Sequence, residues 1–433
     1  MTEGAVTAAS VVRRVPLVRP WTGPEELEAA RRVLESGTLV KGPECAAFER
    51  ELAERCGRQH AVAMNSGTSA LWVALQALGV GPGTRVVVPD LTFPATGNAV
   101  RLCGATPVLC DVRPDTWNLD PVALRRVLAD AGGAGGARGA DAGGAGGAGA
   151  AGGGRGAGDA GARGADAGGA GGLWVVMPVD QFGCPADWDE IAAVAAPAGA
   201  AVLEDAACAL GAERGGARPG ARAAAAMLSF HPRKVVTTGE GGALVTDDAA
   251  LAARFRALRD HGVGADGRFA EPALNLRFPE MAAAMGRAQL GRLDEAVRRR
   301  RAHAARYRAL LADLGLGFQE GGEGVLHPYQ TFAVALADAM PARDAVLAAL
   351  RARGVEATLA SFALHRLPHL AGSSGEAAAD AAEAAEAAAA TGDARFPVAS
   401  YLADRAVALP LFPQMTAEDV DHVAASLRAA LGG

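Results

Sequence analysis

The chain from residue 16 to residue 130 alternates between helical and extended patterns of apolar and polar positions. Apolar residues at helical spacing predict amphipathic helices over residues 25–36 and 44–56. Short apolar runs bounded by Gly, Pro or Asp predict buried strands over residues 86–88 and 106–112. Alternation of this kind is typical of an α/β domain with a mostly parallel sheet, and we expect that fold class.

Two more buried strands continue the alternation further along the chain, over residues 173–179 and 200–203. The second strand carries Glu204 and Asp205 at its carboxyl end. Ligands of α/β sheets bind at such strand ends, and an ionised carboxylate there must be paired or stay in water. Asp205 is therefore a candidate partner for a positively charged group, such as a protonated pyridine nitrogen.

Two stretches of biased composition interrupt this pattern. Residues 131–172 contain only Ala and Gly apart from three Arg and three Asp. Ordering these 42 residues would cost roughly 40 kcal/mol at about 1 kcal/mol of backbone entropy per residue, and Ala methyl groups recover little of it. We expect a disordered surface insertion, with a partner-binding linker as the alternative. The Ala-rich residues 371–392 are expected to form a solvated helix or a flexible insertion.

Charge and cysteine content narrow the class of protein. The formal charge is −6, and no basic run is long enough to follow a nucleic-acid backbone, so we expect no nucleic-acid partner. The basic run 298–301, with His303, Arg306 and Tyr307 after it, is interpreted as the solvated face of a long helix. The six cysteines form no C-x-x-C pair, so neither a disulfide framework nor a metal site is expected.

The ends and apolar runs of the chain show no membrane signal. The N-terminus lacks a charged region followed by an apolar one, and no apolar run reaches about 18 residues. We expect a cytoplasmic protein with no membrane partner.

A lysine lies in the most informative stretch of the chain, residues 229–242. Lys234 stands between Ser229 and a Gly-rich turn, and Arg233 precedes it. Burial and a neighbouring cation would both lower the pKa of the lysine and make its amine available as a nucleophile toward an aldehyde. A surface lysine in a loop is the alternative interpretation.

Two other stretches could hold parts of an aromatic, phosphorylated ligand. Gly67, Thr68 and Ser69 precede an amphipathic run and would stand at a helix N-terminus, where free N–H groups bind phosphate or serve only as a cap. Phe93 follows the strand 86–88 and could stack on an aromatic ring or pack in the core. A phosphate cradle, a carboxylate, an aromatic plate and a lysine together match what pyridoxal 5′-phosphate (PLP) needs from a protein.

The order of these stretches resembles the DegT/DnrJ/StrS family of sugar aminotransferases, within fold type I of PLP enzymes. The resemblance covers nearly the whole chain. It rests on residues 16–18, 41–43, 65–71, 89–100, 179–183, 204–207, 229–242, 261–262, 275–277, 288–290 and 409–411. It implies a large domain over residues 1–262, with a mostly parallel sheet between helices, and a smaller α+β C-terminal domain over residues 263–433.

The resemblance also implies roles for individual residues. Lys234 would form the Schiff base with PLP, and Asp205 would hold the pyridinium nitrogen. The remaining cofactor-binding positions are Gly67, Thr68, Ser69 and Ser229 at the phosphate, Phe93 at the ring, and Cys208 near the phenolic oxygen. Asn275 would reach the phosphate of a neighbouring subunit, which implies a homodimer with shared active sites.

Some positions depart from the family pattern, and others are assigned a role only because of their position in the sequence. Position 208 is Cys where the family usually has His or Gln, and position 276 is Leu rather than an aromatic residue. Cys is a weaker hydrogen-bond donor, so we expect the Schiff base to be tuned differently in this chain. His231, Arg277 and His365 are candidate substrate contacts, although His231 and His365 could equally be solvated or packed.

The expected reaction is a PLP-dependent transamination by a ping-pong mechanism. L-Glutamate is the expected amino donor, and a keto group of a nucleotide-linked deoxysugar is the expected acceptor. The alternatives are a keto-cyclitol acceptor, a PLP-dependent sugar dehydratase, and a non-catalytic protein that binds PLP or a sugar as a regulatory module. Relatives that act as dehydratases replace the lysine with His, and the chain has Lys at that position.

Overall fold

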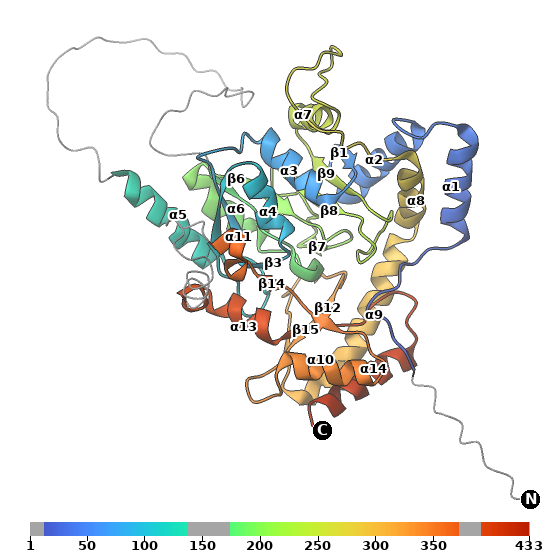
Figure 1. Ribbon diagram of the computed structural model, residues 1–433, viewed down its shortest axis with the longest axis vertical. Coiled ribbons are helices and arrows are strands. Elements are labelled where there is room, and N and C mark those ends of the chain that lie inside the picture. The colour runs from blue at the N-terminus through green and yellow to red at the C-terminus, as the bar shows by residue number, and fades with distance from the viewer. Residues whose placement is uncertain (1–12, 137–173, 372–390, 433) are drawn as a thin grey trace, which may run out of the picture.

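The computed structural model describes residues 13–136, 174–371 and 391–432. A seven-stranded sheet lies among helices, and a four-stranded sheet lies beside it, toward the C-terminus of the chain (Figure 1). The fold class is therefore α/β with a mainly parallel central sheet, which confirms the prediction. No helix in the described part of the chain is long and apolar enough to cross a membrane.

The larger sheet is mostly parallel. Its strand order is β1-β9-β8-β6-β5-β2-β4, and β9 is the strand that runs antiparallel to its neighbours. Valine-rich strands such as β2 are buried over most of their length, as expected when helices cover both faces. The strands are β1 (His60–Met64), β2 (Arg85–Pro89), β4 (Thr106–Cys110), β5 (Trp174–Val176), β6 (Ala201–Asp205), β8 (Ala225–Ser229) and β9 (Gly242–Thr246).

Helices cover the two faces of this sheet with separate cores, because successive strand residues point to opposite sides. Val62 and Leu203 pack with α3, α4 and α7, whereas Ala61 and Ala226 pack with α2, α8 and α9. Toward β2, α5 and α6 cover the second face. The helices are α2 (Pro43–Cys56), α3 (Gly67–Ala77), α4 (Ala95–Leu102), α5 (Pro121–Gly136), α6 (Trp188–Ala195), α7 (Ala249–Arg259), α8 (Glu280–Gly291) and α9 (Leu293–Leu311).

The smaller sheet is antiparallel, and both ends of the described chain pack beside it. Its order is β10-β12-β15-β13, and Val15 near the N-terminus forms a bridge with Val355. The N–H of Leu411 donates to the carbonyl of Leu17 at 3.3 Å. The elements are β10 (Gly317–Phe318), β12 (Phe332–Ala335), β13 (Thr358–Leu359), β15 (Ala406–Leu409), α10 (Arg343–Ala352), α13 (Pro397–Arg405) and α14 (Ala417–Ala430).

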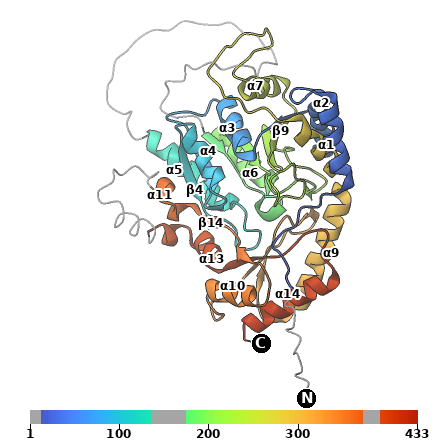
Figure 2. The ribbon, with the colours of Figure 1, turned by 45° about the vertical axis from the view of Figure 1, so that its right-hand side comes forward.

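Two features connect the sheets. Helix α9 extends from α8 to α14, and both views show it along one side of the molecule (Figures 1 and 2). The short strands β3 (Leu91–Thr92) and β14 (Phe362–Ala363) pair with each other across the two parts. Helix α8 follows the predicted domain boundary but packs on α1 (Pro24–Ser36) and α2. The division at residue 262 stays a prediction.

The predicted element bounds differ from the observed ones at the ends. Helices α1 and α2 each begin at a proline, one residue earlier than predicted, because proline suits the first helical position. Strand β4 ends at Cys110, and β6 extends to Asp205. The prediction of disorder from residue 131 was wrong for residues 131–136, which continue α5 as its last turns. The rest of that insertion and residues 372–390 lie outside the described residues.

The basic run on α9 is only partly a solvated face. Arg300 is 2% exposed and donates to the carbonyls of Tyr329, Gln330 and Leu411. Tyr307 is fully buried. The prediction was wrong at these two positions, because the side of α9 that bears them packs against the smaller sheet. Burial without an anionic partner lowers the pKa of Arg300 to about 10.

Candidate functional site

Asp205 is the carboxylate that the fold places at the end of β6. It lies two residues beyond Leu203 and so faces α3 and α4. Its Oδ2 accepts a hydrogen bond of 2.8 Å from the hydroxyl of Thr96, in the first turn of α4. Its Oδ1 accepts one of 3.2 Å from the N–H of Ala207. The carboxylate is 4% exposed, so it is buried but oriented by two donors.

The electrostatic surroundings of Asp205 suit a cationic partner. Burial raises the pKa of its carboxyl, although Thr96, the Ala207 N–H and the charge of Lys234 act in the opposite direction. A buried carboxylate in this state gains from a further positive or proton-donating neighbour. The protonated nitrogen of a pyridine ring is a group of that kind.

Lys234 lies in the turn that follows β8. The turn is closed by a hydrogen bond of 2.8 Å from the Lys234 N–H to the carbonyl of His231. The side chain is half-buried, and its Nζ lies 3.1 Å from Sγ of Cys208, three residues after Asp205. The lysine amine and the Asp205 carboxylate are thus brought to the same end of the sheet.

The N-terminus of α3 forms a cradle beside β8. The Ser66 hydroxyl accepts from the Ser69 N–H at 3.1 Å and caps the helix, while the N–H groups of Gly67 and Thr68 have no acceptor within the helix. A Cβ on Gly67 would lie 3.1 Å from Cβ and 3.3 Å from Oγ of Ser229. Glycine therefore keeps open the space where exposed N–H groups and a serine hydroxyl meet, as a phosphate requires.

Phe93 presents an exposed ring at the same end of the sheet. It is 66% exposed, which sets it apart from the buried aromatic residues of the core. Its only ring partner among the described residues is Phe362, at 6.2 Å between centroids in an edge arrangement. The pairing of β3 with β14 holds the backbone on both sides of this contact. One face of Phe93 is available to stack on a planar ligand.

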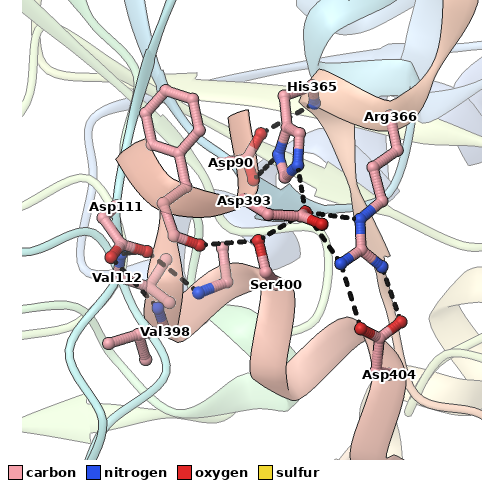
Figure 3. Close-up of polar contacts among 11 residues, drawn as sticks. Asp90, Asp111, Val112, His365, Arg366, Asp393, Val398, Ser400 and Asp404 are labelled. Atoms are coloured by element: carbon pink, nitrogen blue, oxygen red, sulfur yellow. Dashed lines mark hydrogen bonds and ion pairs between the residues drawn. The ribbon is translucent and has the colours of Figure 1, made fainter. Parts of the chain in front are cut away.

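His365 is placed differently from a pocket-lining residue. It is 4% exposed and lies between two carboxylates, with Nδ1 2.6 Å from Asp90 and Nε2 2.8 Å from Asp393 (Figure 3). Carboxylates accept hydrogen bonds, so this arrangement satisfies both ring nitrogens only when the imidazole is doubly protonated. Arg366 joins Asp393 to Asp404 in the same network. The described hydrogen bonds of the His365 ring connect Asp90 with Asp393 and so stabilise the fold. A contact between His365 and the substrate stays a prediction.

The described side-chain contacts of Arg277 and Asn275 are with residues other than Lys234. Arg277 forms an ion pair with Asp260, which also pairs with Lys41. Asn275 is exposed, and its side-chain oxygen accepts from the Arg277 N–H at 3.4 Å.

His231 lies in the turn that carries Lys234, and its ring forms a hydrogen bond within that turn. Its Nδ1 accepts from the N–H of Arg233 at 3.2 Å, and burial lowers the pKa of its ring.

Thr96 is the site residue that sequence reasoning missed. It lies within the stretch 89–100 that carried part of the resemblance, three residues after Phe93. A hydroxyl residue in the first turn of a helix is usually read as part of a cap. The available signal was its place at the end of the same strand-to-helix connection as Phe93.

The comparisons with known proteins identify the family of the chain. The model of the DegT/DnrJ/EryC1/StrS aminotransferase family matches residues 20–134 and 174–428. The chain is similar to DesV from S. venezuelae, solved in complex with a ketimine intermediate, with 32% identity, a TM-score of 0.76 and coverage of 96% of this chain and 98% of that one.

Two more solved structures are similar over nearly the whole chain. DesI, solved in the presence of its TDP-sugar product, has 30% identity and a TM-score of 0.76, with 97% of this chain and 94% of that one covered. A DegT/DnrJ/EryC1/StrS aminotransferase from Brucella abortus has 27% identity and a TM-score of 0.77, with coverage of 94% and 96%. The chain belongs to the DegT/DnrJ/EryC1/StrS family of PLP-dependent sugar aminotransferases.

Proposed function

We propose that this enzyme transfers an amino group from L-glutamate to a keto group of a nucleotide-linked deoxysugar. The observation that carries the proposal is the meeting of Lys234, Asp205 and the α3 cradle at one end of the sheet, in a member of a sugar aminotransferase family. DesI, which is 30% identical, was solved with its TDP-sugar product. This likeness favours a nucleotide-linked sugar over a keto-cyclitol.

The residues present fit PLP. Asp205 would pair with the ring nitrogen, Phe93 would stack on the ring, and Ser229 with the Gly67 and Thr68 N–H groups would hold the phosphate. When bound, PLP supplies an electron sink that stabilises the negative charge left by removal of a proton from the substrate's α-carbon. Asp205 would favour that chemistry by keeping the ring nitrogen protonated.

Lys234 has two tasks in this proposal. Its Nζ would be the amine that binds the cofactor's aldehyde carbon, and once displaced by the amino donor it would move a proton from the donor's α-carbon to the carbon that carried the aldehyde. The chain contains only two lysines, and Lys41 is ion-paired with Asp260. Lys234 is therefore the lysine available beside Asp205.

The proposed assembly is a homodimer with shared active sites. Asn275 is exposed, and the described hydrogen bond of its side chain stays within its own segment. The same segment exposes Phe269 at 75% and Leu274 at 55%. Apolar side chains this exposed favour contact with another protein surface, and a second copy would let Asn275 reach the phosphate of that copy.

The lysine assignment is tested by reducing the protein with borohydride in the presence of PLP and locating the added mass by peptide mass spectrometry. We expect the label on Lys234, its loss in Lys234→Arg, and its retention in the matched control Lys41→Arg. Label that persists in Lys234→Arg would overturn the assignment.

The acceptor is tested by loading the enzyme with glutamate until the cofactor carries the amino group, removing the donor, and adding candidate ketones. We expect the original absorbance to return with a keto-sugar nucleotide and not with a keto-cyclitol. Return only with the cyclitol would replace the proposed acceptor class, and failure with glutamate would replace the donor.

A further inference from the structure

Two carboxyl groups are buried behind the site on residues that the mechanism does not use. Asp180 and Glu204 are 0% and 1% exposed. Within the described chain, Oδ2 of Asp180 and Oε1 of Glu204 are buried and receive no hydrogen bond from a donor. Uncompensated buried charges of this kind are costly, so the pair requires an explanation.

The other oxygen of each carboxyl accepts at least one hydrogen bond. Oδ1 of Asp180 accepts from the Ala186 N–H at 2.8 Å and from the indole N–H of Trp188 at 3.0 Å. Oε2 of Glu204 accepts from the Gly220 N–H at 2.9 Å. Each group therefore has one buried oxygen left without a donor, and the two side chains are close enough to interact with each other.

We infer that Asp180 and Glu204 share one proton, held on Oε1 of Glu204 and donated to Oδ2 of Asp180. One proton supplies the missing donor, satisfies both orphaned oxygens and removes one of two adjacent buried charges. Both residues belong to stretches that the family resemblance singled out but to which the reaction assigns no task.

The charges around the pair agree with this protonation. Burial, followed by the negative charge of Asp180, raises the pKa of Glu204 well above its usual range. Asp205 adds negative charge on the Asp180 side. Arg58 is the nearby cation that opposes these effects at Glu204, but it is ion-paired with Asp247 at 2.6 Å.

The shared proton closes a ring of bonds around the backbone of Asp205. The Asp180 N–H donates to the Asp205 carbonyl at 3.0 Å, and the Asp205 N–H donates to the Pro178 carbonyl at 2.8 Å. Glu204, the residue before Asp205, then returns to Asp180 through its side chain. Glu204 is thus a positioning residue for Asp205; this consequence rests on the proposed function, whereas the shared proton does not.

The proton itself is tested by infrared spectroscopy, without substrate. The C=O stretch of a protonated carboxylic acid is separate from that of a carboxylate. Near neutral pH we expect this band in the wild type and in the exposed control Glu190→Gln, and its loss in Glu204→Gln. A band that is unchanged in Glu204→Gln would overturn the inference.

The positioning role is tested by cofactor binding as a function of pH. In wild type we expect the affinity for PLP to decline at alkaline pH, when the pair loses its shared proton. The Glu204→Gln amide still donates to Asp180 but does not titrate, so this variant should bind PLP with wild-type affinity and without that decline. Glu204→Ala leaves Asp180 without that donor, and we expect the PLP dissociation constant to rise about tenfold. Equal weakening in both variants, or an alkaline decline that persists in Glu204→Gln, would overturn the positioning role.

These outcomes are distinct from a failure of the proposed function. If Glu204→Ala does not fold, the infrared band and the Glu204→Gln titration still decide the inference. Absence of the reduced PLP label from Lys234 in wild type would instead overturn the lysine assignment, and it would not affect the infrared result.

Discussion

Removing the Thr96 hydroxyl should weaken cofactor binding more than removing the neighbouring hydroxyl of Thr92. Thr96 has one hydroxyl proton, and the 2.8 Å contact with Asp205 uses it. The 3.1 Å contact between the hydroxyls of Thr92 and Thr96 must then have Thr92 as donor. Thr96→Val removes a donor from a buried carboxylate, whereas Thr92→Val removes a bond between neutral groups.

The two changes differ in expected magnitude. A hydrogen bond to a charged group contributes about 1.5–3 kcal/mol, and one between neutral groups about 0.5–1.5 kcal/mol. At about 1.4 kcal/mol per factor of ten, Thr96→Val should raise the PLP dissociation constant about 10- to 150-fold, and Thr92→Val by about tenfold at most. The cause is that an Asp205 with fewer donors is harder to ionise and pairs less well with the ring nitrogen.

The assay is titration of the apoenzyme with PLP, followed by absorbance. Thr92→Val is the matched control because both residues are about 1% exposed and lose the same atoms. Thr96→Ser keeps the hydroxyl and should recover most of the affinity. Wild-type affinity in Thr96→Val, or equal losses in the two valine variants, would refute the proposed route through Asp205.

Two further predictions concern other parts of the structure. Burial opposes the charge of His365, but its bonds to Asp90 and Asp393 outweigh that effect and raise its pKa above 6.5. A raised folded-state pKa stabilises the protein below pH 6.5, and that stabilisation is lost as the pH rises through the folded value. The melting temperature of wild type relative to His365→Gln should fall over that interval, and a difference independent of pH would contradict this. Gly67→Ala places a Cβ 3.1 Å from Cβ of Ser229. Overpacking costs about 1–3 kcal/mol, so we expect the PLP dissociation constant to rise roughly 5- to 150-fold. Equal weakening of the binding of pyridoxal, which lacks the phosphate, would count against a phosphate cradle.

The sequence predicted the parts of the site that follow from local rules. Asp205 could be placed because a short apolar run precedes it, and parallel strands end at the same edge of a sheet. The turn before α3 could be placed because a helical pattern begins there. These inferences need only neighbouring residues, and the structure has each feature where the pattern predicted it.

The parts that were missed depend on contacts between distant segments. Arg300 belongs to a basic run that has the pattern of a solvated face, yet it is buried because the carbonyls of Tyr329, Gln330 and Leu411 converge on it. The bond from Thr96 to Asp205 joins residues 109 positions apart. No periodicity in one sequence reports such pairs, because neither residue alters the pattern around the other.

The bridge between Val15 and Val355 has a consequence for synthesis of the protein. Val15 and Leu17 leave the ribosome long before their partners, which lie near positions 355 and 411. At about 5–20 residues per second, roughly 400 residues take about 20–80 s. The larger sheet, whose last strand ends at Thr246, can assemble during that time. We therefore expect growing chains to expose Val15 and Leu17 until the residues near position 411 have been synthesised.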